Sequence, residues 1–375
     1  MLYLDHAATT PVKPEALKAA WPYLTKEYGN PSSVHEIGLR AKAALNWARE
    51  TCANFLGSNP EEIYFTSGAT EANNLAIKGI ALANPRGRHI VSSPTEHEAV
   101  LQAIDYLERV HGFEVTLLPV AGDGSIRAAD LRAALRPDTT LVTLMVANNE
   151  IGTIHPIGEF AAIAAERGVP LHTDAVQAIG WLNTSVTNLG VQSLSLSGHK
   201  FGAPKGSGLL YLKAGVEAEA LIHGGGQERG LRSGAQNVAW AVALGVALQT
   251  VDNNASQVAT VTKDFIEAVL SEFPKASLTG ATPDSGSRHP AIASFTFDGI
   301  NGETLLLELE SAGVTCSSGS ACAAGSDEPS HVLKALGLAE DTCRTAVRFS
   351  FGHDASAEQA GQALNALRKA MRRLG

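Results

Sequence analysis

The sequence predicts an α/β protein with a large, mostly parallel sheet and a second, smaller α+β domain. Between Ile63 and Leu196, short apolar segments with strand character alternate with longer segments that have helical periodicity. This alternation is typical of a sheet that helices cover on both faces. After the polar segment 252–256 a different set of helices and strands follows. We therefore predict a large domain over residues 15–256 and a small domain over 1–14 and 257–375.

The residues before the alternation predict one strand and two helices. Residues 2–10 form a short strand-like segment that Pro11 interrupts, and helical patterning covers 14–23. A longer amphipathic segment covers 41–56. Gly57 follows it as the expected C-cap, because glycine adopts the left-handed conformation of helix ends without steric cost.

The large domain is expected to contain six strands with helices between several of them. The strands cover residues 63–65, 89–92, 113–118, 140–147, 170–173 and 193–196, and a further apolar run covers 209–212. Helices are expected over 70–82, 98–109 and 237–251. Ligands of such sheets gather beyond the carboxyl ends of the strands, so these ends are where site residues are expected.

The small domain is expected to combine four helices with two strands. The helices cover 263–272, 303–312, a short stretch near Val332 and 357–373, and the strands cover 293–297 and 347–351. A loop rich in glycine and serine covers 316–326 and contains two of the four cysteines.

Charge and cysteine usage exclude several classes of function. A net charge of −9 argues against nucleic acid or an anionic membrane as the main ligand. The four cysteines are too few for a disulfide framework, and none has the Cys-x-x-Cys spacing of a zinc or thioredoxin-like site. The sequence has neither an apolar run long enough to span a bilayer nor a basic-then-apolar leader. We therefore expect a cytoplasmic protein without a metal site.

The turn after the predicted strand at 193–196 carries the most reactive group. Ser197, His199 and Lys200 crowd together at this strand end, and four glycines follow Leu196 before residue 209. A lysine kept partly neutral by such neighbours can attack an aldehyde carbon. A solvated lysine in a glycine-rich turn is the alternative.

Three other strand ends carry candidate ligand-binding residues. Thr70, in the turn before a helix, suits an anion, although Ser and Thr also cap helices there. His97 can stack on a planar cofactor or be a structural histidine. Asn149, beside Asn148, can orient a ligand oxygen or simply form a turn.

A carboxylate completes this set. Asp174 follows a buried segment and needs a cationic or protonated partner, which is either a salt bridge or a pyridinium nitrogen. Gln177, one helical turn later, can reach an adjacent ring oxygen. A reactive lysine, an acidic partner for a ring nitrogen and an anion site are together what pyridoxal 5′-phosphate requires.

The sequence resembles the cysteine desulfurases of the NifS/IscS type. These belong to the class V aminotransferase-like branch of the fold-type-I enzymes that depend on pyridoxal phosphate. The resemblance runs nearly end to end and is carried by seven motifs that start at Tyr3, Phe65, Thr95, Asn148, Asp174, Ser197 and His223, together with Ser317-Ser-Gly-Ser-Ala-Cys322. The element Ser197-Gly-His-Lys200 indicates the branch, and the Cys322 loop indicates the reaction.

The resemblance implies a role for each matched residue. Lys200 bonds the cofactor and moves the substrate α-proton, and His97 lies against the ring. Asp174 pairs with the ring nitrogen and Gln177 with the ring hydroxyl. The phosphate site is formed by Ala69, Thr70, Ser197 and His199. The substrate carboxylate is bound by Asn149 and Arg348.

Cys322 is the implied nucleophile. It takes sulfur from L-cysteine as a persulfide, leaves L-alanine, and passes the sulfur to an acceptor protein for iron–sulfur cluster assembly or other thiolation. Cys316 and Cys343 are interpreted as small buried hydrophobic residues. The rival activities are selenocysteine lyase or another β-elimination, and the rival from another class is a scaffold protein that keeps only the fold.

Two departures from the family pattern concern partners. The resemblance implies a homodimer in which a threonine reaches the phosphate of the partner subunit, and this chain has Ala235 at that position. The sequence also ends at Gly375, short of the C-terminal extension with which related members dock a scaffold protein. The acceptor of the sulfur therefore stays open.

Overall fold

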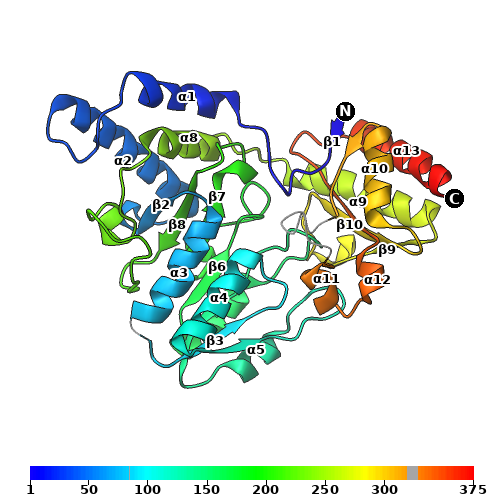
Figure 1. Cartoon of the computed structure of the whole chain (residues 1–375), viewed down its shortest axis with the longest axis horizontal. Coiled ribbons are helices and arrows are strands. Elements are labelled where there is room, and N and C mark those ends of the chain that lie inside the picture. Colours follow the sequence, from blue (N-terminus) through cyan, green and yellow to red (C-terminus); the bar gives the residue numbers. More distant parts are fainter. Residues whose placement is uncertain (84, 319–327) are drawn as a thin grey trace.

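A seven-stranded sheet forms the centre of the molecule (Figure 1). The computed structural model describes residues 1–83, 85–318 and 328–375. Its strands, in the order β2-β8-β7-β6-β5-β3-β4, are β2 (Ile63–Thr66), β8 (Gly208–Leu212), β7 (Ser193–Ser197), β6 (Leu171–Asp174), β5 (Thr139–Thr143), β3 (His89–Ser92) and β4 (Glu114–Leu117).

The expectation of a mostly parallel sheet is confirmed, with β8 as the exception. β7 and β8 pair in antiparallel orientation, and β8 is also antiparallel to β2. Only the segment 198–207 joins β7 to β8, and so short a connection suits antiparallel neighbours, since a parallel pair needs a longer crossover. The other neighbouring pairs are parallel.

Helices cover both faces of this sheet. On one face α3 (Ala69–Ala83) and α4 (Glu98–His111) pack in a cluster that includes Ile90. The next residue, Val91, belongs to the cluster on the opposite face, because successive side chains of a strand point to opposite sides. Helices that contribute to this second cluster are α1 (Pro14–Thr25), α2 (Glu36–Leu56), α5 (Ala128–Ala134), α6 (Ile157–Glu166), α7 (Val186–Leu189) and α8 (Val238–Gln249).

A second, smaller sheet lies beside the first. Its strands β12 (Ala346–Ser350), β10 (Ile292–Phe297) and β9 (Ala276–Leu278) are antiparallel. Phe265, Phe295 and Phe349 form the centre of its hydrophobic cluster. Its helices are α9 (Ala255–Glu272), α10 (Gly302–Ser311), α11 (His331–Ala335), α12 (Glu340–Cys343) and α13 (Ala357–Leu374).

The first residues of the chain lie with this second sheet. β1 (Leu2–Tyr3) pairs in parallel with β11 (Val314–Thr315), and Leu4 packs in the same hydrophobic cluster. This placement agrees with a small domain that includes both termini. The exact division at residues 14 and 256 stays a prediction.

Several element boundaries differ from those predicted. The helix after the linker begins at Ala255 instead of Lys263, and α2 begins at Glu36 instead of Ala41. The strand predicted over 140–147 ends at Thr143, although the N–H groups of Leu144 and Val146 still donate to carbonyl oxygens of β6 residues. The C-cap at Gly57 is confirmed, with a left-handed φ of 69°.

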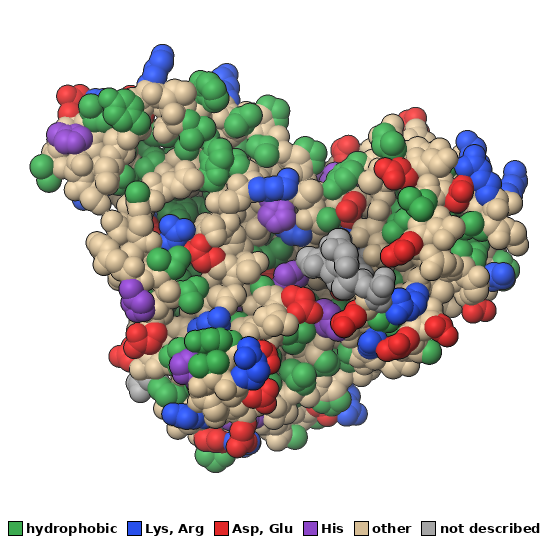
Figure 2. Space-filling view, viewed as in Figure 1, with side chains coloured by type: hydrophobic (Ala, Val, Ile, Leu, Met, Phe, Trp, Pro, Cys, Tyr) green, Lys and Arg blue, Asp and Glu red, His purple; other side chains and the backbone are tan. Residues whose placement is uncertain are grey.

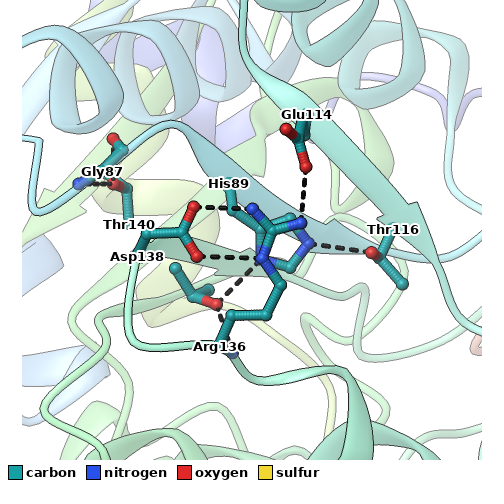
Figure 3. Close-up of polar contacts among 8 residues, drawn as sticks. Gly87, His89, Glu114, Thr116, Arg136, Asp138 and Thr140 are labelled. Atoms are coloured by element: carbon teal, nitrogen blue, oxygen red, sulfur yellow. Dashed lines mark hydrogen bonds and ion pairs between the residues drawn. The ribbon is translucent and has the colours of Figure 1, made fainter.

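A closed polar cluster stabilises the amino ends of the strands, far from their carboxyl ends (Figure 3). The ring of His89 lies between the hydroxyls of Thr116 and Thr139, both 2.8 Å away. Arg136 pairs with Asp138 and Glu114 beside this ring. Burial and the charge of Arg136 lower the pKa of His89. Each of these groups has its partner within the cluster, which indicates a structural role.

Within the described ranges, no helix combines the length and the apolar character needed to cross a bilayer.

Candidate active site

A cavity of about 520 Å³ lies at the carboxyl ends of β5, β6 and β7. This is the edge of the sheet at which ligands are expected. It brings together every site residue predicted from the sequence that the structure describes: Ala69, Thr70, His97, Asn149, Asp174, Gln177, Ser197, His199, Lys200 and Arg348. The predicted nucleophile, Cys322, lies outside the described residues.

Lys200 is held against the amino-terminal segment of the chain. It closes the short 3₁₀ turn Gly198–Lys200 that directly follows β7. Its Nζ donates to the carbonyl oxygens of Ala7, at 2.6 Å, and Ala8, at 2.9 Å. Residues of the first strand-like segment therefore form one wall of the cavity, which the sequence did not predict.

The turn between β2 and α3 has the geometry of an anion site. α3 begins at Ala69, so the N–H groups of its first turn point toward the cavity end of the helix. Gly68 and Gly208 approach so closely that a Cβ on Gly208 would lie 2.5 Å from the Gly68 Cα. This close approach requires glycine at position 208 and brings β8 against the turn.

His199 lies in the cavity as a neutral ring. Burial lowers its pKa to about 4, and the nearby cations Lys200 and Lys205 act in the same direction. Its Nδ1 lies 3.1 Å from Thr9 Oγ1. His199 can therefore hold an anion by hydrogen bonding, whereas Lys205, which also lines the cavity, supplies positive charge.

Asp174 ends β6 and is only 7% exposed. Its Oδ1 accepts a hydrogen bond of 2.9 Å from the Val176 N–H, and its Oδ2 accepts one of 2.6 Å from Asn73 Nδ2. These two hydrogen bonds fix the orientation of the carboxylate. Nearby Glu96 is completely buried, and this burial and the charge of Asp174 raise its pKa well above the usual value. The site therefore contains two buried carboxyl groups, of which Glu96 has the raised pKa.

His97 is oriented by its own helix. It is the N-cap of α4, and its Nδ1 accepts a hydrogen bond of 3.0 Å from the Ala99 N–H. In the neutral ring the proton is therefore on Nε2. Gln177 is also fixed, since its Nε2 donates to the carbonyl oxygen of Ala7 at 3.0 Å.

Arg348 reaches the cavity from β12 of the second sheet. Its side chain is only 1% exposed, so Arg348 is not part of an ion pair on the protein surface. Its two terminal nitrogens donate to Asp5 Oδ1 and to the Asn149 carbonyl oxygen, both at 2.7 Å. Asn148 forms a turn instead, because its Oδ1 accepts the N–H groups of residues 150 and 151.

The described residues on either side of 319–327 are bound to this site. Ser317 and Arg348 exchange two backbone hydrogen bonds. Ser330 Oγ donates to Glu150 Oε2 at 2.6 Å, and His331 Nε2 lies 2.9 Å from the Glu96 carbonyl oxygen. Both neighbours of the segment that carries Cys322 are thus fixed to loops that line the cavity.

The three described cysteines are poor nucleophiles. Burial raises the pKa of Cys52 to about 12 and also raises the pKa of Cys316 and of Cys343. Cys343 is buried, as predicted, whereas Cys316 is only partly buried at the edge of the small-sheet cluster.

Ala235 lies outside the cavity that contains Lys200. It lines a neighbouring cavity of about 270 Å³, which shares Ser67 and Gly206 with the first one. Within one protein chain, Ala235 therefore does not line the cavity in which the predicted phosphate-binding residues lie.

Comparison with known proteins places the chain in a family. The family model described as aminotransferase class-V matches residues 2–362. The chain belongs to the class-V aminotransferase family. The chain is 44% identical to a cysteine desulfurase IscS from Methanosarcina thermophila, over 100% of this chain and 92% of that protein.

Solved structures agree with this assignment and confirm the predicted fold class. A NifS-like protein, 34% identical, superposes with a TM-score of 0.89 and covers 99% of both chains. A structure described as SspA in complex with cysteine, 37% identical, superposes with a TM-score of 0.82 over 94% of this chain and 99% of that one. The resemblance to cysteine desulfurases is thereby confirmed.

Sequence reasoning missed four residues that hold the site together. Asp5 pairs with Arg348, and Asn73, His172 and Ser193 lie behind Asp174. One signal was available for His172, because it precedes Asp174 by two residues and alternate residues of a strand face the same side. The contacts of Asn73 and Ser193 depend on packing between elements distant in sequence.

Proposed function

We propose that this member of the class-V aminotransferase family is a cysteine desulfurase that depends on pyridoxal phosphate. It converts L-cysteine to L-alanine and leaves the sulfur on Cys322 as a persulfide. The observation that supports this most directly is the cavity that combines Lys200, Asp174 and the turn at Gly68. The identity with a cysteine desulfurase IscS, and with SspA in a structure described as a complex with cysteine, supports the choice of substrate.

The residues of the cavity fit the cofactor. A volume of about 520 Å³ is within the range of small-molecule sites. Among the described residues, Asp174 accepts hydrogen bonds from Asn73 Nδ2 and the Val176 N–H, and neither of these donors is a cation, which suits a protonated ring nitrogen. The Gly68 turn and Lys205 suit the phosphate at the other end.

In this arrangement each residue has one task. The Ala69 backbone, Thr70, Ser197 and His199 would hold the phosphate, and Gln177 would face the ring oxygen. His97 would lie against the ring and Asp174 would pair with the ring nitrogen. When bound, the cofactor supplies an electron sink for negative charge at the substrate α-carbon.

The protein groups carry the protons and the sulfur. Lys200 would hold the cofactor through its Nζ and would remove and return the α-proton of the substrate. Arg348 and Asn149 bind the substrate carboxylate, so Asp5 has to share or release the guanidinium when substrate enters.

The sulfur step needs no outside oxidant. The Cys322 thiolate attacks the substrate sulfur, a sulfur–sulfur bond forms, and the carbon–sulfur bond breaks. Its electron pair stays with the carbon fragment, which takes up a proton and becomes alanine.

The partners belong to the same proposal. We expect a cytoplasmic enzyme, because a free catalytic thiol stays reduced in that compartment. We also expect a homodimer. Figure 2 shows hydrophobic side chains over the region of α1 and α2. The exposed apolar residues of these helices and of the loop between them form a patch of the kind that marks interaction sites: Leu17, Trp21, Tyr28, Leu39 and Trp47. The sulfur acceptor is a protein of iron–sulfur cluster assembly or thiolation.

The test is the purified protein with its cofactor and L-cysteine. We expect a visible absorption band, production of alanine, and a persulfide on Cys322 found by mass spectrometry. Borohydride reduction followed by peptide mapping should place the pyridoxyl group on Lys200. A label on Lys205 or Lys213, or selenocysteine as the only substrate, would contradict the proposal.

A further inference from the structure

Four buried polar side chains form one hydrogen-bonded chain that leads away from the cavity. Asn73 Nδ2 donates to Asp174 Oδ2 at 2.6 Å. Asn73 Oδ1 lies 3.0 Å from His172 Nε2, and His172 Nδ1 lies 3.0 Å from Ser193 Oγ. Asn73, His172 and Ser193 have no solvent exposure at all. So much buried polar surface is costly unless each group is satisfied by its neighbour.

Sheet register and helix packing bring these residues together. His172 and Asp174 lie two residues apart on β6 and so face the same side of the sheet. Ser193 is the register partner of His172 on β7. α3, which contributes Asn73, packs over this face.

Only one arrangement of donors and acceptors satisfies the whole chain when Asp174 is ionised. A carboxylate accepts hydrogen bonds only, so the amide nitrogen of Asn73 must face it. The amide oxygen of Asn73 then faces His172 Nε2, which must carry a proton. Burial lowers the pKa of His172 to about 3, so the ring is neutral and Nδ1 has none. Nδ1 therefore accepts the hydroxyl hydrogen of Ser193.

We propose that Asn73 and His172 are positioning residues that hold the Asp174 carboxylate aimed at the ring nitrogen of the cofactor. This inference rests on the proposed function and deepens it. Asn73 supplies one of the two hydrogen bonds that Asp174 accepts from the protein, and His172 prevents the Asn73 amide from turning over. A turned amide would place its oxygen against the carboxylate.

Loss of a member of this hydrogen-bonded chain should affect the cofactor ring and not the substrate-carboxylate site. Loss of the His172 donor would free the Asn73 amide and loosen the Asp174 carboxylate. Substrate binding by Arg348 and Asn149 should change little, because the terminal nitrogens of Arg348 donate to Asp5 and to the Asn149 carbonyl oxygen, which are not members of this hydrogen-bonded chain. The ring nitrogen of the cofactor would then be less protonated, and the cofactor less able to withdraw electrons from the substrate.

The test compares variants of the cofactor-loaded enzyme. His172→Leu removes the N–H donor and keeps a similar volume, whereas His172→Gln restores an N–H near the position of Nε2. The cofactor is labelled with ¹⁵N at its ring nitrogen, so that nuclear magnetic resonance reports its protonation. The dissociation constant of pyridoxal phosphate and the separate kcat and KM for L-cysteine complete the measurements.

His89 provides a matched control. It is also fully buried and also bonded through both ring nitrogens, but at the amino ends of the strands (Figure 3). His89→Leu should lower stability as His172→Leu does and leave the ring-nitrogen signal unchanged.

For His172→Leu we expect the ring-nitrogen signal to shift toward the unprotonated form. If the freed Asn73 amide no longer donates to Asp174, one hydrogen bond to a charged group is lost, which corresponds to about 10- to 100-fold. We therefore expect kcat to fall by this factor and KM to stay within about twofold. His172→Gln should recover most of both changes. If His172→Leu does not fold, Asn73→Ala, which favours the helix, should give the same shift.

An unchanged ring-nitrogen signal in both His172→Leu and Asn73→Ala would overturn the inference, as would an equal shift in the His89→Leu control. These outcomes are distinct from failure of the proposed function. If the unmodified protein binds no pyridoxal phosphate or releases no alanine from L-cysteine, the proposed function itself is wrong.

Discussion

At the scale of single residues, the site separates charges by burial and hydrogen bonding. Asp174 accepts two hydrogen bonds, whereas burial and the charge of Asp174 raise the pKa of Glu96 well above its usual value. His199 is neutral beside two lysines. The cavity thus offers a carboxylate at one end and positive charge at the other, which is the polarity that a pyridinium phosphate requires.

Cys322→Ser should separate cofactor binding from turnover. The residues predicted to hold the cofactor do not include Cys322, so the variant should bind pyridoxal phosphate normally. Persulfide formation and alanine production should fall by at least about 100-fold, because a hydroxyl is a much weaker nucleophile than a thiol. Mass spectrometry and an alanine assay measure both. Near-normal alanine production would point to another thiol, and Cys316→Ser is the control for that possibility.

Ala235→Thr tests the expected contact with the partner subunit. If position 235 meets the phosphate across the dimer, the added hydroxyl should contribute about 1.5–3 kcal/mol and tighten cofactor binding about tenfold or more. The dissociation constant of pyridoxal phosphate is measured for both proteins. Unchanged or weaker binding would show that Ala235 does not face the phosphate or that another group, such as Arg232, already replaces the hydroxyl.

At the scale of elements, α11 ties the second sheet to the cavity. Ser330 Oγ both caps this helix, by accepting the Leu333 N–H, and donates to Glu150. His331 approaches the carbonyl oxygen of Glu96, next to His97. Because α11 closely follows the segment that carries Cys322, its position sets where that segment ends.

Ser330→Ala should slow sulfur transfer without weakening cofactor binding. Loss of the cap costs about 1 kcal/mol of stability, and loss of the bond to Glu150 frees α11 from the cavity loop. Ser356→Ala is the matched control, since Ser356 caps α13 in the same way. Both variants should lose similar stability in urea unfolding. Persulfide formation should slow only in Ser330→Ala, by about three- to tenfold, which corresponds to one lost hydrogen bond. Equal rates of persulfide formation in the two variants would contradict the role of the bond between Ser330 and Glu150.

At the scale of the whole molecule, buried neutral histidines link stability to pH. Burial lowers the pKa of His172 to about 3 and that of His289 to about 4, and both rings are completely enclosed. In the unfolded chain these histidines bind a proton below about pH 6.5, whereas in the folded protein they do not. The unfolded state therefore takes up more protons as the pH falls.

The free energy of unfolding should thus decrease from about pH 6.5 toward pH 4. Each such histidine contributes up to about 1.4 kcal/mol per pH unit within this window. Urea unfolding at pH 7, 6 and 5 measures the slope. His289→Gln, which removes one titrating group from the interior, should have a shallower slope by about this amount. A slope that is flat, or equal in the two proteins, would refute the assignment.

The fold class and most of the candidate site residues could be predicted from the sequence. Strand–helix alternation predicted the sheet because buried strands and amphipathic helices have different periods. Lys200, Asp174, His97 and Thr70 could be found because each follows a strand, and parallel strands end at one edge. The identity of the reaction came from the residues around Cys322, whose structure lies outside the described ranges.

Which side chains contact one another could be seen only in the tertiary structure. The antiparallel β8, the Ala7 and Ala8 carbonyls on Lys200, and the Asp5–Arg348 pair join residues that are far apart in the sequence. The chain from Asp174 to Ser193 likewise needs the register of β6 with β7 and the packing of α3. Local patterns report which face of an element is buried. The partner of a buried polar group depends on how elements pack against one another.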